Sequence, residues 1–426
     1  MSERRPSAVI LVENLPVPLD RRAWQEALAL HQAGWDVTVI SPRGSGDMAR
    51  LRDRIDGIEV LRYPQRAARG LAGYLVEYLP SMVFTAAWLL FRRSRGRIDV
   101  VHGCNPPDLF WLFGRLARWE GGAYVFDQHD VGPELATTKW GARGPRARAL
   151  AAITRWLERR SYRTADLVLV PNDSYRQISI ERGGVPAEDV LLIRNAPDVA
   201  RYRELAAGAI VDPHRVGYVG VMGTQDGLDL LLDAWSIVVR QADMTDANLE
   251  LFGDGEARRA LERQAGRLGL NDRVRFHGYG RAAEFVPVLA ACAICVSPDP
   301  PTPFNDVSTM VKVVDYLAMG RGVVAFDLRE TRSVAGDAAV VAWPPTADGL
   351  AGAILGVLRD PERSRRLGEA GSARVGSVGL DWSRSASALV DGYARLLGEA
   401  RARARADGVD NQGGGGDPGG VGGPPR

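Results

Sequence analysis

The sequence contains almost no lysine and very little cysteine. Of its 426 residues 54 are basic, and only Lys139 and Lys312 among these are lysines. The cysteines are Cys104, Cys292 and Cys295. The last two have C-x-x-C spacing, but residues three apart on a strand point to opposite faces. We therefore expect packed core cysteines in a reducing cytoplasm, in preference to a redox or metal site.

The sequence also lacks a strong charge imbalance and a long apolar run near its start. The net charge is +2, which does not indicate nucleic acid as a partner. The first apolar run, Ala8–Val12, is too short for the core of a signal peptide and predicts a strand. These features favour a cytoplasmic protein.

Residues 74–95 form the most apolar segment of the chain and end in three arginines. Glu77 and Pro80 interrupt it, so it is not a convincing membrane span. Two interpretations remain open. The segment is either a buried crossover helix or a peripheral contact with the inner face of the cell membrane, its arginines on anionic head groups.

Apolar strand-like runs alternate with helical patterns along the chain, which predicts an α/β fold with parallel sheets. The length favours two domains. We place an N-terminal Rossmann-like domain at 1–198, a C-terminal one at 199–380, a closing helix at 381–406 and a disordered tail at 407–426. The predicted strands are Ala8–Val12, Asp36–Ile40, Val100–His102, Tyr124–Asp127, Leu167–Val170, Val190–Ile193, Arg215–Val219, Asn248–Phe252, Val274–His277, Ile294–Ser297 and Gly322–Ala325.

Glycine-rich turns follow two predicted strands of the second half. The segment Val219–Gly227 lies between a strand and a helix. Its glycines let backbone amides approach a ligand, and the helix N-terminus suits a phosphate. Gly253 and Asp254 follow the next strand, where Asp254 is either part of the site or the N-cap of a helix. The donor-side residues predicted from these turns are Gly220, Gly223, Thr224, Gln225, Gly253 and Asp254.

The helix predicted at Val311–Met319 carries the most informative pair of charges. Lys312 lies in its first turn, where the helix dipole disfavours a cation unless an anion binds there. Asp315, three residues later, shares the same face. The two suit a diphosphate and ribose hydroxyls; the alternative is a surface ion pair. The loop before the helix adds three predicted donor-side residues, Ser308, Thr309 and Met310.

In the first half, His129 follows the predicted strand Tyr124–Asp127, and Glu134 comes shortly after. His129 is one of five histidines and is either catalytic or structural. The loop between the first strand and the first helix ends in Asp20 and Arg21. Its prolines suit a shaped binding loop, although Asp20 would serve equally as an N-cap. We assign Asp20, Arg21 and Glu134 to the acceptor side.

Taken in order, these segments resemble the family 4 glycosyltransferases of the GT-B fold, in particular bacterial members that build surface polysaccharides. The resemblance covers residues 8–400, and its last part is Trp382 followed by Tyr393, similar to the family's closing helix. The other matching segments are Pro18–Arg22, Gly34–Ile40, Asp99–His102, Phe126–Asp130 with Glu134, Ala165–Pro171, Tyr218–Gly223, Gly227–Ala234, Phe252–Gly255, Val274–Gly278 and Lys312–Gly320 with Val323–Ala325.

The resemblance implies a retaining, hexosyltransferase-like enzyme that needs no metal or cofactor. A nucleotide diphosphate-sugar would bind the second domain, and a glycan or lipid-linked acceptor the first. Asp315 takes the place of the family's ribose-binding glutamate, His129 that of a histidine near the transferred sugar, and Lys312 that of a lysine found in some subgroups.

The sequence departs from the family pattern at three points. The first acid of the usual acidic pair is absent, and Val307 stands near its place. The second acid is the shorter aspartate, Asp315. The glycine-rich turn lacks the usual arginine and lysine. Two alternatives follow: a GT-B protein that binds a nucleotide-sugar with reduced or no turnover, and a sugar-nucleotide epimerase.

Overall fold

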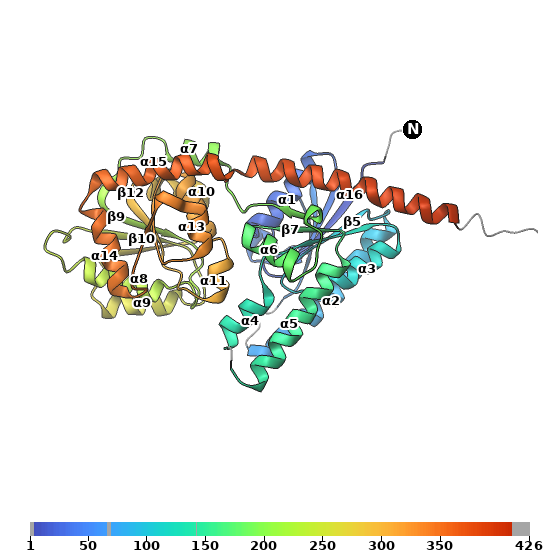
Figure 1. The fold of residues 1–426 in the computed structure, drawn as a ribbon, viewed down its shortest axis with the longest axis horizontal. Helices are drawn as coiled ribbons and strands as arrows, with labels where there is room; N and C mark the ends of the chain where they lie inside the picture. Colours follow the sequence, from blue (N-terminus) through green and yellow to red (C-terminus); the bar gives the residue numbers. More distant parts are fainter. Residues whose placement is uncertain (1–3, 66–69, 142, 411–426) are drawn as a thin grey trace, which may run out of the picture.

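The computed structural model describes residues 4–65, 70–141 and 143–410, which form two lobes side by side (Figure 1). Each lobe has a mainly parallel β-sheet with helices packed around it. The predicted architecture of two Rossmann-like domains is confirmed. Several strands are continuous apolar runs, such as Ser7–Leu11 and Leu167–Val170, because both faces of a parallel sheet are buried.

The first sheet has the strand order β3-β4-β2-β1-β5-β6-β7-β8. All neighbours are parallel except β3 and β4, which form an antiparallel edge that the sequence did not predict. Its strands are β1 (Ser7–Leu11), β2 (Asp36–Pro42), β3 (Arg52–Ile55), β4 (Ile58–Tyr63), β5 (Val100–Cys104), β6 (Ala123–Asp127), β7 (Leu167–Val170) and β8 (Val190–Leu192). Its helices are α1 (Arg21–Gln32), α2 (Gly70–Ser94), α3 (Trp111–Trp119), α4 (Gly132–Trp140), α5 (Pro145–Thr164) and α6 (Asp173–Glu181), with 3-10 turns at Gly46–Ala49 and Ala187–Asp189.

The second sheet has the order β11-β10-β9-β12-β13-β14 and is parallel throughout. Its strands are β9 (Asp212–Val219), β10 (Asn248–Phe252), β11 (Val274–Gly278), β12 (Cys292–Ser297), β13 (Val323–Ala325) and β14 (Ala339–Val341). The helices are α7 (Val199–Ala206), α8 (Leu228–Val238), α9 (Arg258–Arg267), α10 (Ala282–Ala290), α11 (Pro303–Val307), α12 (Val311–Ala318), α13 (Arg329–Ala335), α14 (Ala347–Leu358) and α15 (Pro361–Val378), with a 3-10 turn at Gly336–Ala338.

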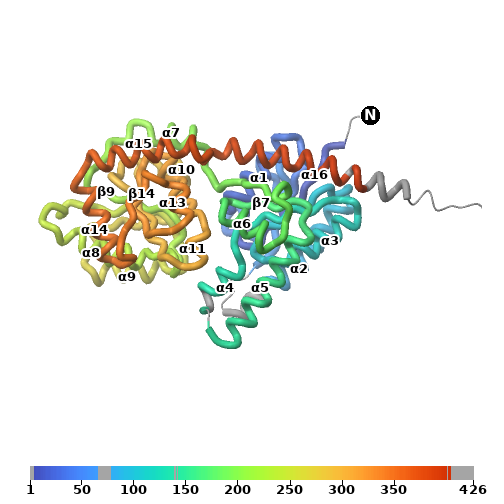
Figure 2. The backbone as a smooth tube through the Cα atoms, in the orientation of Figure 1, coloured from blue at the N-terminus to red at the C-terminus, as the bar shows by residue number. Residues whose placement is uncertain are grey.

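The last helix, α16 (Trp382–Asp410), leaves the second lobe and runs along the first (Figure 2). Its apolar residues Leu389, Tyr393 and Leu396 are buried in the same core as the strands of the first sheet. The Tyr393 hydroxyl also lies 2.6 Å from Nδ1 of His102 on β5. The helix extends four residues beyond the predicted end at 406, and residues 411–426 of the predicted tail lie outside the described part of the chain.

The two cysteines of the C-x-x-C segment correct one expectation. Cys292 and Cys295 are both free and fully buried, as predicted. They do not face opposite sides of the sheet, however. The register of β12 against β9 shifts between Cys292 and Ile294, and both sulfur atoms lie 3.1–3.3 Å from where Gly217 would carry a Cβ. This irregularity brings both thiols into one core cluster.

Candidate active site at the domain interface

In the first domain, His129 is anchored by Asp127 at the end of β6. The Nε2 atom of His129 contacts the Asp127 carboxylate, and Asn105 holds the His129 backbone N–H at 2.6 Å. Arg22 of α1 donates to the same carboxylate from Nε at 3.0 Å and from Nη2 at 2.6 Å. Sequence reasoning singled out His129 but not Arg22, whose partner is more than a hundred residues away.

Burial and charge shift the pKa values of this cluster in different directions. Burial lowers the pKa of His129, but the charge and hydrogen bond of Asp127 outweigh it and raise the pKa to about 9. Burial, together with the charge of Asp127, raises the pKa of Glu26 well above its usual value. His102, behind them, has a pKa lowered by burial. At neutral pH the cluster therefore holds a protonated His129 and a neutral His102, and the shift of Glu26 favours its protonated form.

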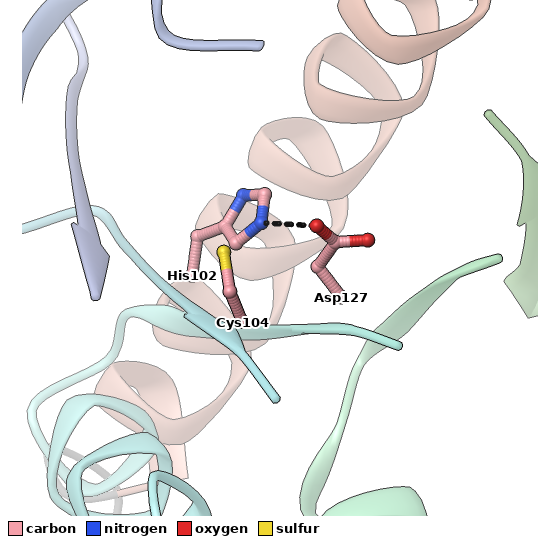
Figure 3. Close-up of side chains that lie close together, drawn as sticks. All are labelled: His102, Cys104 and Asp127. Atoms are coloured by element: carbon pink, nitrogen blue, oxygen red, sulfur yellow. Dashed lines mark ion pairs between the residues drawn. The ribbon is translucent and has the colours of Figure 1, made fainter. Parts of the chain in front are cut away.

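His102, Cys104 and Asp127 offer ligand atoms that lie within 4.8 Å of one another (Figure 3). A metal ion here would have to compete with the Arg22 guanidinium for Asp127. It would also need the thiolate of Cys104, and burial raises the pKa of that thiol well above its usual value. The donor set is therefore a poor fit for a metal, because a buried cation already occupies the carboxylate.

The three predicted acceptor-side residues have different surroundings. Asp20 caps α1, with its carboxylate accepting from the Ala23 backbone N–H at 3.1 Å. Glu134 lies in the first turn of α4 and binds Arg182, which also contacts Glu158. Both acids thus have structural partners. Arg21 instead crosses the domain interface, since its Nη1 atom is 3.0 Å from the Asp315 carboxylate of the second domain.

In the second domain, the glycines at the ends of β9 and β10 allow two backbone segments to approach closely. A Cβ on Gly253 would lie 1.8 Å from the carbonyl oxygen of Gly220, and one on Gly255 2.5 Å from that of Met222. Gly227 has φ of +70°, and a Cβ there would lie 2.0 Å from the oxygen of Pro298. These positions exclude side chains for packing reasons alone, independent of any ligand.

The exposed side chains near this turn are neutral or acidic. Thr224 is exposed and faces Glu256 at 3.4 Å, and Gln225 is partly buried. Asp254 is 3.5 Å from Arg258 and is not an N-cap, because Ala257 takes that position in α9. The alternative interpretation of Asp254 as a capping residue is therefore wrong.

Lys312 lies beside the glycine-rich turn, at the carboxyl ends of β9 and β12. Its Cε atom is 3.0 Å from where Gly220 would carry a Cβ, and its Nζ atom is 5.4 Å from the centre of the Tyr218 ring. Nζ also donates to Asp299 at 2.6 Å. Burial lowers the pKa of Lys312, but Asp299, Tyr218 and Asp226 raise it above its usual value. Lys312 is therefore a buried, charged lysine.

Asp299 is a residue that sequence reasoning missed. It is 1% exposed and follows β12 by two residues, within the segment Ser297–Asp299. Its position just after a strand of the second sheet could have identified it, because ligands of open α/β sheets bind at the carboxyl ends of the strands. A second carboxylate, Asp226, accepts from the Gly223 N–H at 2.8 Å and has a pKa raised by burial.

Asp315, one turn after Lys312, is buried and does not pair with it. It accepts from Arg21 at 3.0 and 3.2 Å, and the phenol of Tyr202 interacts with both groups. Burial raises the pKa of Asp315, while Arg21 opposes that shift. The simple i, i+3 ion pair considered as an alternative is thus wrong, because each residue has its own partner.

The loop before α12 is held by the first domain. Ser308 Oγ lies 2.9 Å from the hydroxyl of Tyr175, and Thr309 donates to Glu330 at 3.0 Å. Glu330 also contacts Ser174 of α6. Met310 is the residue before α12 and makes no side-chain cap. The predicted donor-side hydroxyls therefore lie at the interface between the two domains.

Both halves of the chain match known protein families. Residues 19–196 match the family described as glycosyl transferase 4-like domain, and residues 213–360 match glycosyl transferases group 1. Among curated proteins, the alpha-D-kanosaminyltransferase of Streptomyces kanamyceticus is 27% identical over 228 residues, which is 51% of this chain. The alignment spans 57% of that relative's own length.

Solved structures share the whole fold. The sucrose-phosphate synthase of Thermosynechococcus elongatus has a TM-score of 0.72 at 21% identity, covering 93% of this chain and 100% of the other. Anabaena HepE, solved with UDP and glucose, has a TM-score of 0.62 at 17% identity, covering 92% and 100%. At such identities the likeness establishes the fold and not the substrate.

Proposed function

The chain belongs to the glycosyltransferases of the GT-B fold, and from this premise we propose a retaining, metal-independent transfer from a nucleotide diphosphate-sugar to a glycan or lipid-linked acceptor. The observation that supports it best is the position of Lys312. A buried, charged lysine lies against a glycine-rich turn at the carboxyl edge of the second sheet. That edge is where open α/β sheets bind nucleotides.

The proposed mechanism uses charge stabilisation in place of a metal. As the bond from the sugar to the diphosphate breaks, Lys312 and the backbone amides of the turn stabilise the leaving oxygens. The acceptor hydroxyl attacks from the same face and loses its proton to the departing phosphate. His129 holds a proton near neutral pH and, in this proposal, contacts the sugar hydroxyls from the first domain.

A donor panel tests this proposal. Purified protein is mixed with UDP-, GDP-, ADP- and TDP-sugars, with magnesium or with EDTA, and hydrolysis and thermal stability are measured. We expect one donor to stabilise the protein and to be turned over equally in both conditions, because a ligand that binds the native state raises its stability. An absolute metal requirement would contradict the mechanism, and binding without any turnover would favour a non-catalytic binding protein.

We also propose peripheral membrane contact, through a broader surface than residues 74–95. Among the described residues, no helix combines the length and apolar character needed to cross a bilayer. On α2, however, Leu79 is 70% and Val83 61% exposed, so its described part is not a wholly buried crossover helix. On α3, Leu112, Leu116 and Trp119 form an exposed stripe at helical spacing.

The sequence analysis placed the arginines at the end of α2 on lipid head groups, but the structure does not support this role for them. Arg92 is buried and binds Asp36 and Thr38, Arg93 contacts Glu120, and Arg95 contacts Glu59 and the ring of Phe91. Each of them thus has a partner within the protein. Any cations that face a lipid surface must therefore come from other helices.

Helices α3 and α5 supply exposed arginines without such partners. Arg115, Arg159 and Arg163 are exposed and form no ion pair with a carboxylate in the described ranges. They accompany Trp119 on α3 and Trp156 on α5, which are 85% and 50% exposed. The two helices are in contact through Trp111 and Trp156. Exposed aromatic rings beside unpaired arginines suit an anionic lipid surface.

A further inference from the structure

The donor site of the second domain has too little positive charge for a diphosphate. Lys312 is its buried cation, and Asp299 already neutralises it at 2.6 Å. Asp226 adds a second carboxylate that interacts with Lys312. The turn from Val219 to Gly227 contains no basic residue. A bound diphosphate therefore needs a further cation, because the two carboxylates would repel the phosphates beside them.

Arg21 is the arginine that the first domain presents next to this site. It is the first residue of α1, directly after the cap Asp20, and its guanidinium reaches across to α12. It contacts Asp315, which lies three residues after Lys312 on the same helix. Side chains three apart on a helix are neighbours, with Cβ atoms about 5–6 Å apart. The residue that the guanidinium contacts is thus about one helical turn from the lysine along α12.

The contact between Arg21 and Asp315 can be exchanged. The Arg21 side chain is 37% exposed, whereas the carboxylate it binds is 7% exposed. The Nη2 atom of Arg21 is buried, and the guanidinium also interacts with the phenol of Tyr202. Burial raises the pKa of Asp315, and the charge and hydrogen bonds of Arg21 oppose this shift. A ribose hydroxyl can replace one of these donors.

We propose that Arg21 changes partner when donor binds: the ribose takes Asp315, and the released guanidinium binds the diphosphate, supplying the cation that the glycine-rich turn lacks. This inference rests on the proposed nucleotide-sugar donor. The exchange gives the guanidinium one anion in place of another, and it gives the Asp315 carboxylate hydroxyl donors in place of the guanidinium. It also links donor binding to the approach of the two domains, because Arg21 belongs to the first and Asp315 to the second.

The exchange predicts opposite effects on two ligands that differ only in their phosphates. The probes are UDP, GDP, ADP and TDP with the corresponding nucleosides, and dissociation constants are measured by calorimetry. In Arg21→Ala, the best nucleoside diphosphate should bind about tenfold or more weakly, as expected when a charge-assisted contact is lost. The nucleoside should bind as well as before or more tightly, because Asp315 is already free. Arg21→Lys should recover part of the loss.

Two comparisons make the test specific. Asp315→Asn should weaken the nucleoside, but the ratio of diphosphate to nucleoside affinity should not fall, since Arg21 remains available. Arg118→Ala is the matched control, because Arg118 is 42% exposed and faces a 4% exposed carboxylate, Asp166, within the first domain. It should leave both affinities unchanged. Circular dichroism of each variant reports whether it is folded.

The outcomes separate this inference from the proposed function. If wild type binds a nucleoside diphosphate and Arg21→Ala binds it equally well, the exchange is wrong and the donor assignment stands. If the affinities for both ligands change by the same factor, Arg21 affects only the conformation of the site, and the exchange is again wrong. If wild type binds none of the four nucleoside diphosphates, the proposed function and the exchange are both wrong.

Discussion

The two domains hold their buried charges in different ways. In the first, Arg22, Glu26, Asp127 and His129 contact one another beneath the end of β6, and most of their charge is balanced within the cluster. In the second, Lys312 is balanced by carboxylates beside a turn that has backbone amides but no basic side chain. We infer that the first cluster maintains the fold and positions His129, whereas the second depends on a ligand to complete it.

Removing Arg22 should break the first cluster with the largest effect. Arg22→Ala leaves Asp127 buried without its main cation, a type of change that costs about 3–5 kcal/mol of unfolding free energy. Urea unfolding measures the loss. Arg118→Ala, which removes a partly exposed arginine from Asp166, should cost about 1 kcal/mol or less. Similar losses in the two variants would mean that the first cluster does not stabilise the fold.

The pH dependence of stability should reveal the proton on His129. Its pKa is raised to about 9 in the folded protein, against about 6.5 for an unfolded chain. The stabilisation is therefore fully present below about pH 6.5, declines as the pH rises, and is lost above about pH 9. Its upper limit is about 3 kcal/mol. The charged groups that act on this ring are Asp127, Asp20 and Arg22, and His129 in turn acts on Glu26.

The measurement is the difference in unfolding free energy between wild type and His129→Gln at pH 6, 7.5 and 9.5. The difference should shrink steadily as the pH rises. A difference that stays constant would show that folding does not raise the pKa of His129, and its contact with Asp127 would then be an ordinary hydrogen bond.

In the second domain, Lys312→Ala should reduce activity more than stability. Loss of the lysine should cost about 2–3 kcal/mol of transition-state stabilisation, or about 30- to 150-fold in kcat/KM. Lys312→Arg should recover little, because the broad guanidinium has no room between Gly220 and Tyr218. Steady-state kinetics with the best donor decide this, and near-wild-type activity of the alanine variant would assign the diphosphate to another cation.

The contrast between the domains also marks what the sequence could predict. Strand ends were predictable from apolar runs, so His129 and the glycine-rich turn were found in their correct places. Contacts between residues that are far apart in the sequence were not predictable. Arg21 and Asp315 are 294 residues apart, and nothing in either local pattern indicates the pair. Local irregularity was equally invisible, as the register shift beside Cys292 shows.

The smallest effect per residue concerns Arg115, Arg159 and Arg163, which form no ion pair with another described residue. If α3 and α5 contact anionic lipid, replacing Arg115, Arg159 and Arg163 with Gln should weaken binding to phosphatidylserine-containing vesicles by about 1 kcal/mol per charge at most. The effect should fade at high salt because exposed charges are screened. Vesicle co-sedimentation across a salt series measures both.

A matched triple variant isolates the position of the charges from their number. Arg259, Arg263 and Arg267 on α9 are exposed and form no ion pair in the described part of the chain, so replacing them with Gln removes the same net charge from the second domain. Vesicle binding should then stay close to wild type. Equal losses in the two triple variants would mean that net charge alone drives the binding. If neither triple variant loses vesicle binding, the exposed tryptophans of α3 and α5 bind another partner, such as a second copy of the chain. Analytical ultracentrifugation would detect such a dimer.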